Sequence, residues 1–251
     1  MKNYAIILAS GTGERSGLEI PKQFIKIAGK TVIEHTLNIF QNNENIDRII
    51  VVTNSDYIEL VYQLASKNNF YKVCHVVRGG ETRQQSSYIG LQAVADELHD
   101  IAEDNAKVLI HDAVRPFVTD RIINDCIKAL DSYKAVDVAI TSADTIIKVN
   151  SENIIETIPQ RKYLKRGQTQ QAFDFQTIMK AHKLALDSND VEVTDDCGLI
   201  TKFNPTDIYV VNGDDSNIKI TYPIDISIAD KLFQLKTYCG AKQDLNQLKN
   251  N

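Results

Sequence analysis

Short runs rich in Val and Ile alternate along this chain with longer segments whose apolar residues recur at helical spacing. The runs predict buried strands over 4–9, 46–53, 72–77, 108–111 and 135–141. The segments between them predict helices over 32–40, 55–67, 83–98 and 120–133, the last capped by Asp120 or Thr119. Because strands joined by helices pair in parallel, this alternation predicts an α/β fold with a Rossmann-like, mostly parallel sheet flanked by helices.

The pattern changes after about residue 141. Two short strands over 145–149 and 153–158, joined by a polar turn, predict a β-arm at about 142–165 that projects from the sheet. A helix over 175–186, a strand over 208–211 and a closing helix over 224–235 follow, and a polar tail at about 238–251 is expected to fray. We expect a single domain over 1–251, since a chain of this length can bury one large core.

The composition argues against several classes of protein. A net charge of −5 disfavours nucleic-acid binding, which would require a basic face. No stretch approaches the roughly 20 apolar residues that span a bilayer, and the first apolar run is too short for a signal peptide. Two disulfides stay open as an alternative, but reduced thiols are favoured for the widely spaced Cys74, Cys126, Cys197 and Cys239. The expected location is the cytoplasm, with no membrane or nucleic-acid partner.

The loop after the first strand is typical of a phosphate-binding site. Its small residues, including Ser10, Gly11 and Gly13, let backbone N–H groups approach an anion closely. Arg15 and Lys22 add two positive charges beside the same loop, as a nucleoside triphosphate requires. A plain turn and a dinucleotide-binding loop are the alternatives. The second lacks its third glycine and an acidic partner for the ribose.

Two further motifs follow predicted strands. The glycine pair at 79–80 allows a flat base to approach, and Ser86 can hydrogen-bond it; a polar strand–helix turn is the alternative. Asp112 is placed to hold Mg²⁺ and Arg115 to reach a second anionic group, unless Asp112 only caps its turn. His111 is expected to pack, since no partner histidines lie at ligand spacing. Ligands of such sheets bind outside the carboxyl ends of the strands, so these motifs should converge.

Polar residues also gather late in the chain, at 167–171, 194–196 and 217–221. Lys219 alternates with apolar residues in a predicted strand. That setting favours a functional lysine, and a side chain that merely reaches out to solvent is the alternative. Tyr163 and Phe173 are expected to lie in the core.

One enzyme family carries the same motifs in the same order. The chain resembles the cytidylyltransferases that join CTP to a polyol phosphate, through LASGTGER, PKQF, GGETRQQS, HDAVRP, GQTQQ, TDD and NIKIT. The resemblance runs from about residue 4 to residue 235. Members act on 2-C-methyl-D-erythritol 4-phosphate or on D-ribitol 5-phosphate. It implies a nucleotidyltransferase domain that binds CTP and a polyol phosphate, uses Mg²⁺, and forms a homodimer through its arm.

The resemblance also implies roles for individual residues. Catalysis would depend on Arg15, Lys22 and Lys219. The nucleotide would contact Ala9, Ser10, Gly11, Gly13, Gly80, Glu81, Arg83, Ser86 and Ala113. The polyol phosphate would contact Arg115, Thr145, Arg161 and Thr194, where Thr145 and Arg161 come from the arm and reach the neighbouring subunit's site. Asp112 would bind Mg²⁺.

The reaction implied is an in-line attack of the polyol phosphate on the α-phosphorus of CTP. Ala143 stands where methylerythritol enzymes typically place an arginine before Asp-Thr, which favours D-ribitol 5-phosphate over 2-C-methyl-D-erythritol 4-phosphate as the acceptor. Gln170 replaces the proline that is usual in the family's Thr-Pro-Gln. Two other classes stay open: a nicotinamide-dependent oxidoreductase, which would bind NADH tightly, and a non-catalytic nucleotide-binding protein, which would bind CTP without releasing pyrophosphate.

Overall fold

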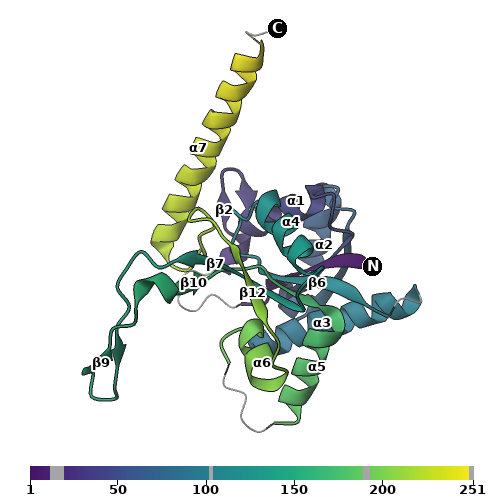
Figure 1. Cartoon of the computed structure of the whole chain (residues 1–251). Coiled ribbons are helices and arrows are strands. Elements are labelled where there is room, and N and C mark those ends of the chain that lie inside the picture. Colours follow the sequence, from purple (N-terminus) through teal and green to yellow (C-terminus); the bar gives the residue numbers. More distant parts are fainter. Residues whose placement is uncertain (12–19, 102–103, 189–192, 249–251) are drawn as a thin grey trace.

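The computed structural model describes residues 1–11, 20–101, 104–188 and 193–248, with side chains as far as residue 235. Within these ranges, eight strands form the central sheet in the order β10-β7-β11-β6-β1-β4-β5, with β12 also paired to β7 (Figure 1). The bounds are β1 Lys2–Ala9, β4 Arg48–Thr53, β5 Val73–Arg78, β6 Ala106–Asp112, β7 Ala135–Thr141, β10 Lys165–Gly167, β11 Gln171–Asp174 and β12 Ile208–Asn212. All pairings are parallel except those of β10 and β11, which confirms the predicted mostly parallel sheet.

Helices cover both faces of this sheet. One face carries α1 (Val32–Asn42), α2 (Ile58–Lys67) and α4 (Asp120–Ala129), and the other carries α3 (Arg83–Asp100), α5 (Phe175–Leu186) and α6 (Asp196–Phe203). Successive residues of a strand point to opposite faces, so the fully buried Ile6 and Ile7 join different core clusters. Burial on both faces explains why the parallel strands are continuous apolar runs rather than alternating ones.

The carboxyl ends of four parallel strands meet at one edge of the sheet. β1 lies between β4 and β6, with Ala9 opposite Thr53 and Leu8 opposite Asp112. β5 continues the edge, with Arg78 opposite Thr53. The loops that follow β1, β5 and β6 therefore open side by side, as the sequence predicts.

Residues 142–165, which we call the arm, extend away from the sheet (Figure 1). The arm contains a hairpin of β8 (Lys148–Val149) and β9 (Ile155–Thr157) and the short helix η4 (Arg161–Tyr163). Its exposed apolar side chains are Ile146, Ile147, Val149, Ile154, Ile155, Ile158 and Tyr163. Tyr163 is 75% exposed, so its predicted place in the core is wrong, whereas Phe173 is fully buried as predicted.

The chain closes with α7 (Pro223–Leu248), which projects from the body (Figure 1). Its first turns pack on a small third core cluster, where Phe233 lies 4.5 Å from Phe117 between ring centres. That cluster also contains Ile27 of the β2 (Lys26–Ile27) and β3 (Lys30–Thr31) hairpin. The helix is longer than the predicted span 224–235 and runs through most of the segment expected as a tail. None of the described helices is long and apolar enough to cross a membrane.

The structure decides one open alternative, corrects one predicted strand and contains elements that were not predicted. The cap of α4 is Thr119, whose hydroxyl accepts a hydrogen bond from Ile122 N at 3.4 Å. Asp120 instead accepts one from Asn43 Nδ2 at 2.7 Å. Lys219 does not lie in a strand, since the backbone around it is irregular. The apolar Ile220 beside it packs into the third core cluster instead of pairing in the sheet. The sequence analysis missed the helix α6 and the strands β2, β3, β10 and β11.

The cysteines agree with the prediction as far as they are described. Cys74, Cys126 and Cys197 are free thiols, and burial raises the pKa of Cys74 to about 11 and that of Cys126 to about 12. They are therefore uncharged at neutral pH. The side chain of Cys239 lies outside the described residues.

Candidate active site

A cavity of about 1000 Å³ opens at the carboxyl edge of the sheet. Its walls come from the loop after β1, the short helix η2 (Lys22–Phe24), the loop between β5 and α3, the end of β6, and the segment around Lys219. The predicted site residues that line it are Ala9, Ser10, Gly11, Lys22, Gly80, Glu81, Arg83, Ser86, Asp112 and Lys219. The fold thus brings most of the predicted nucleotide and catalytic residues to one place.

The wall between β1 and α3 is held together by a contact between two serines. Ser10 Oγ and Ser86 Oγ lie 2.9 Å apart, and Ser86 Oγ also accepts a hydrogen bond from Gly80 N at 3.2 Å. Gly79 lies against both serines, and a Cβ added there would come within 2.5 Å of Ser10 Cβ. Only glycine at position 79 lets the two loops approach this closely. Gly80 is required for a different contact, since a Cβ there would overlap with Gln85 Cβ.

A capping box fixes the start of α3. Thr82 Oγ1 accepts a hydrogen bond from Gln85 N at 3.1 Å, and Gln85 Oε1 accepts bonds from Thr82 N and Glu81 N at 3.3 and 2.8 Å. These bonds satisfy backbone donors that a helix start leaves unpaired. The loop that carries Gly80 and Glu81 is therefore anchored at its helical end.

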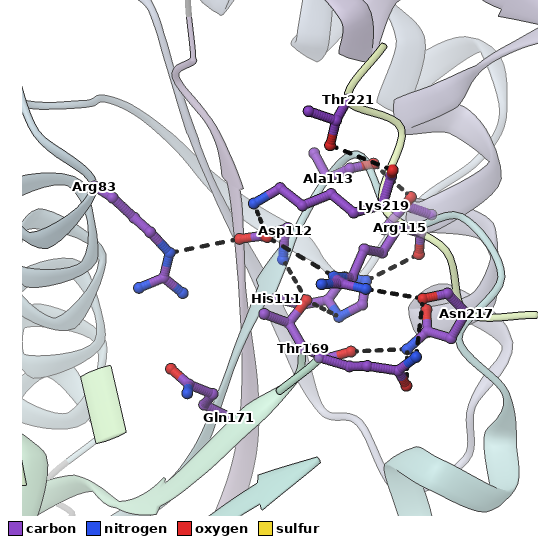
Figure 2. Close-up of polar contacts among 12 residues, drawn as sticks. Arg83, His111, Asp112, Ala113, Arg115, Thr169, Gln171, Asn217, Lys219 and Thr221 are labelled. Carbon is purple, nitrogen blue, oxygen red and sulfur yellow. Dashed lines mark hydrogen bonds and ion pairs between the residues drawn. The ribbon is translucent and has the colours of Figure 1, made fainter. Parts of the chain in front are cut away.

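Asp112 is surrounded by positive charges (Figure 2). Its carboxylate accepts a hydrogen bond from Lys219 Nζ at 2.8 Å, and the Nε atoms of Arg83 and Arg115 lie 3.6 and 3.9 Å from it. Burial alone would raise the pKa of this carboxyl, but the three cations, Lys219 foremost, hold that pKa well below its usual range. Asp112 is therefore ionised across the physiological pH range.

The two predicted catalytic lysines enter from opposite ends of the chain. Lys22 Nζ donates to the carbonyl oxygen of Thr221 at 2.9 Å, close in sequence to Lys219. Lys219 reaches Asp112 from the same segment (Figure 2). Both lysines line the cavity. For Lys22, a bond to a phosphate oxygen would be stronger than its present bond to a neutral carbonyl oxygen.

Three supporting residues lie in motifs that the sequence analysis singled out, but it assigned them no role. Gln23 is buried and donates to the carbonyl oxygens of Ala9 and Gly11 at 2.6 and 3.1 Å, so it fixes the backbone where β1 ends. Asn217 is fully buried, and its backbone carbonyl oxygen accepts a hydrogen bond from Arg115 NH1 at 2.9 Å, while its side-chain Nδ2 donates to the carbonyl oxygen of Thr169 at 3.0 Å. Thr169 Oγ1 accepts a bond from Asp112 N at 3.1 Å. Buried amides and hydroxyls of this kind carry no periodic signal, so only their contacts identify them.

His111 is a packing residue, as predicted. Its ring is fully buried against Phe40, and Nε2 lies 3.1 Å from the carbonyl oxygen of Arg115. Burial lowers its pKa to about 4, so the ring is neutral at pH 7.

The other predicted site residues fall into two groups, those that the structure does not describe and those that it places outside the cavity lining. Arg15 and Gly13 lie outside the described residues. Ala113 is fully buried and does not line the cavity. Arg115 does not line it either, but its Nε lies 3.9 Å from Asp112 Oδ2, and Asp112 is a lining residue. The remaining polyol-phosphate residues also lie outside the cavity lining: Thr145, Arg161 and Thr194. Their predicted role stays a prediction.

Comparison with known proteins identifies the family. A family model described as IspD, 2-C-methyl-D-erythritol 4-phosphate cytidylyltransferase, matches residues 4–235, close to the span of the resemblance. The chain belongs to the IspD family. It is therefore a cytidylyltransferase, and the oxidoreductase and binding-only alternatives are not supported.

Proteins similar to this chain are named for different substrates. A Haemophilus influenzae protein, the bifunctional ribulose 5-phosphate reductase/CDP-ribitol pyrophosphorylase Bcs1, is 44% identical over 94% of this chain, and the chain spans about half (49%) of its length. A Vibrio parahaemolyticus ribitol-5-phosphate cytidylyltransferase is 37% identical over 90% of this chain and 93% of its own. The crystal structure of the 4-diphosphocytidyl-2C-methyl-D-erythritol synthase of Anaerococcus prevotii superposes with a TM-score of 0.81, at 34% identity over 93% of this chain and 96% of that one.

Proposed function

We propose that this enzyme transfers CMP from CTP to D-ribitol 5-phosphate, giving CDP-ribitol and pyrophosphate in the cytoplasm. The observation that carries the acceptor choice is the 44% identity to a protein named for CDP-ribitol synthesis. Ala143 at the base of the arm supports the same acceptor, since methylerythritol enzymes typically have an arginine there.

The cavity suits this chemistry without a general base. A phosphate oxygen of the acceptor attacks the α-phosphorus of CTP, a new O–P bond forms, and the bond to the β-phosphate oxygen breaks as pyrophosphate leaves. A phosphate monoester is already an anionic nucleophile, so the enzyme must mainly align the groups and offset crowded negative charge. Lys22 and Lys219 supply positive charge at the cavity, and we propose that Arg15 adds a third cation.

We propose that Asp112 holds the Mg²⁺ that this transfer uses. Magnesium prefers oxygen ligands and is often bound by one or two carboxylates together with substrate phosphates. Asp112 offers an ionised carboxylate at the cavity, so the residues fit that ion. When bound, Mg²⁺ would neutralise charge on the phosphates. Lys219, which contacts Asp112 at 2.8 Å, is then available to a phosphate oxygen.

The acceptor end of the site is proposed to be completed by a second copy of the chain. The arm presents apolar side chains to solvent, including Ile154 and Ile155, and such a surface is typical of a protein interface. Arg161 lies on the same arm, and its NH1 donates to the carbonyl oxygen of Ala143 at 3.0 Å. In a homodimer, Arg161 and Thr145 would contact the acceptor phosphate bound by the partner, opposite Thr194.

A second acceptor has support of its own. The family model and the Anaerococcus prevotii structure are both named for 2-C-methyl-D-erythritol 4-phosphate chemistry. Parallel assays of pyrophosphate release with the two acceptors separate the alternatives. Release with D-ribitol 5-phosphate alone supports the proposal, and release with the methylerythritol compound alone replaces it.

A further inference from the structure

A partly buried ion pair joins the first residues of α3 and α6. Arg83, the first residue of α3, donates from NH1 to Asp196 Oδ2 at 2.6 Å, and its Nε lies 3.6 Å from Asp112 Oδ1. Asp196 is the first residue of α6 and is fully buried. One guanidinium thus spans two carboxylates, one beneath the cavity wall and one facing the cavity (Figure 2 shows the contact of Arg83 with Asp112).

Asp196 is held in place from several directions. Oδ2 also accepts a hydrogen bond from Ser87 Oγ at 3.1 Å, and Oδ1 lies 3.2 Å from His182 Nε2. Its backbone N–H donates to Gln171 Oε1 at 3.1 Å. Burial would raise the pKa of Asp196, but Arg83 and then His182 lower it, so the carboxylate stays charged. A fixed, buried anion can therefore dictate where the guanidinium lies.

The geometry requires an arginine. A guanidinium presents several donors in a rigid plane, so NH1 and Nε can face different carboxylates at once. An ammonium on a flexible chain is a single charged point and cannot span both. The third nitrogen group, NH2, is buried and has no hydrogen-bond partner among the described residues. The orientation of Arg83 therefore depends on its two carboxylates.

We propose that Asp196 is a positioning residue that acts through Arg83. Asp196 draws the guanidinium of Arg83 away from Asp112. Arg83 therefore stays in the cavity wall at the start of α3, and the Asp112 carboxylate remains accessible to ligands. Without Asp196, Arg83 would turn to Asp112, the nearest remaining carboxylate, and pair with it more closely. This inference rests on the proposed function, because it takes the cavity to be the CTP site.

The test is a double-mutant cycle with Asp196→Asn, Arg83→Gln and the combined variant. We expect each single variant to raise the Kd for CTP, measured by isothermal titration calorimetry, by about tenfold, and to lower kcat/KM by at least as much. Because Asp196 acts through Arg83, the combined variant should be no worse than Arg83→Gln alone. If the fold-changes of the two single variants multiply in the combined variant, the two residues act independently and the proposal is overturned.

Two further variants separate positioning from stability. Asp174→Asn removes another carboxylate that is mostly buried (8% exposed) and pairs with Lys134 at 3.2 Å. Asp174 lies outside the cavity lining, so this variant should lower Tm without changing the Kd for CTP. If Asp196→Asn does not fold, Arg83→Lys decides: it keeps the charge but cannot span both carboxylates, so CTP binding should fall as it does in Arg83→Gln. Wild-type binding in Arg83→Lys would refute the proposal. A wild-type enzyme that neither binds CTP nor releases pyrophosphate would instead refute the proposed function.

Discussion

Gly79→Ala should force apart Ser10 and Ser86, the two serines that hold together the cavity wall between β1 and α3, and the structure gives the size of the effect. The added Cβ would lie 2.5 Å from Ser10 Cβ and 2.9 Å from the hydroxyl oxygens of both Ser10 and Ser86. Carbon atoms pack at about 3.5–4.0 Å, so the overlap is about 1 Å. Gly79 cannot retreat easily, because its N–H donates to the carbonyl oxygen of Thr53 at 2.7 Å. The serines must therefore separate.

Two costs follow from that separation. Overpacking a tight site costs about 1–3 kcal/mol, and losing the hydrogen bond between Ser10 and Ser86 costs about 1 kcal/mol. Part of this free-energy cost should appear as a lower Tm. Because both serines line the cavity, the rest should appear as an increase of about 10- to 100-fold in the KM for CTP, with a smaller effect on kcat. Steady-state pyrophosphate release at varied CTP, with Tm by differential scanning fluorimetry, measures both.

Gly167→Ala is the matched control for this change. The nearest atom to a Cβ at Gly167 is Asp137 Oδ2 at 3.8 Å, an ordinary contact, so both Tm and KM should stay near wild type. A Gly79→Ala enzyme with a wild-type KM for CTP would refute the claim that the cavity wall between β1 and α3 is part of the nucleotide site.

Three other predictions concern catalysis, stability and assembly. Lys22→Ala and Lys219→Ala should each lower kcat by about 10²–10³-fold with the fold retained, measured by pyrophosphate release and circular dichroism; near-normal rates in both would argue against their catalytic role. Burial raises the pKa of Asp137 from 3.8 in the unfolded chain to about 6, so wild-type stability falls as pH rises through this window. Asp137→Asn should therefore be more stable than wild type at pH 7.5 by about 1–2 kcal/mol and lose that advantage by about pH 4 in urea unfolding, whereas a pH-independent difference would contradict the buried charge. Ile155→Asp on the exposed arm should convert a dimer to a monomer in sedimentation velocity and reduce turnover, and an unchanged dimer would place the interface elsewhere.

The sequence predicts the sheet well because its strands are buried on both faces. Continuous apolar runs mark β1, β4 and β6, and the polar motifs after them fall at the carboxyl edge that parallel pairing creates. The antiparallel β11 is short and polar at its start, at Gln171, so it gives no such signal. Its place in the sheet is decided by pairing with β6 and β7, which local sequence does not encode.

The candidate site divides in the same way. Lys219 lines the cavity although its predicted strand was wrong. The alternation of Ile218 and Ile220 reflects a local core contact rather than sheet pairing. Contacts between residues far apart in the chain could not be predicted. Arg83 and Asp196 are 113 positions apart. Asp196 and the buried Asn217 lie in polar motifs that the sequence analysis singled out, but nothing in those motifs predicts which residues they contact. Such partners become visible only when the fold brings them together.

The most direct test of the central claim is pyrophosphate release from CTP and Mg²⁺ with D-ribitol 5-phosphate and 2-C-methyl-D-erythritol 4-phosphate in parallel reactions. We expect release with D-ribitol 5-phosphate, with CDP-ribitol identified by mass spectrometry, and only background release with the methylerythritol compound. Release with the methylerythritol compound alone would contradict the proposed acceptor. No release with either would contradict the transfer assigned to this cavity.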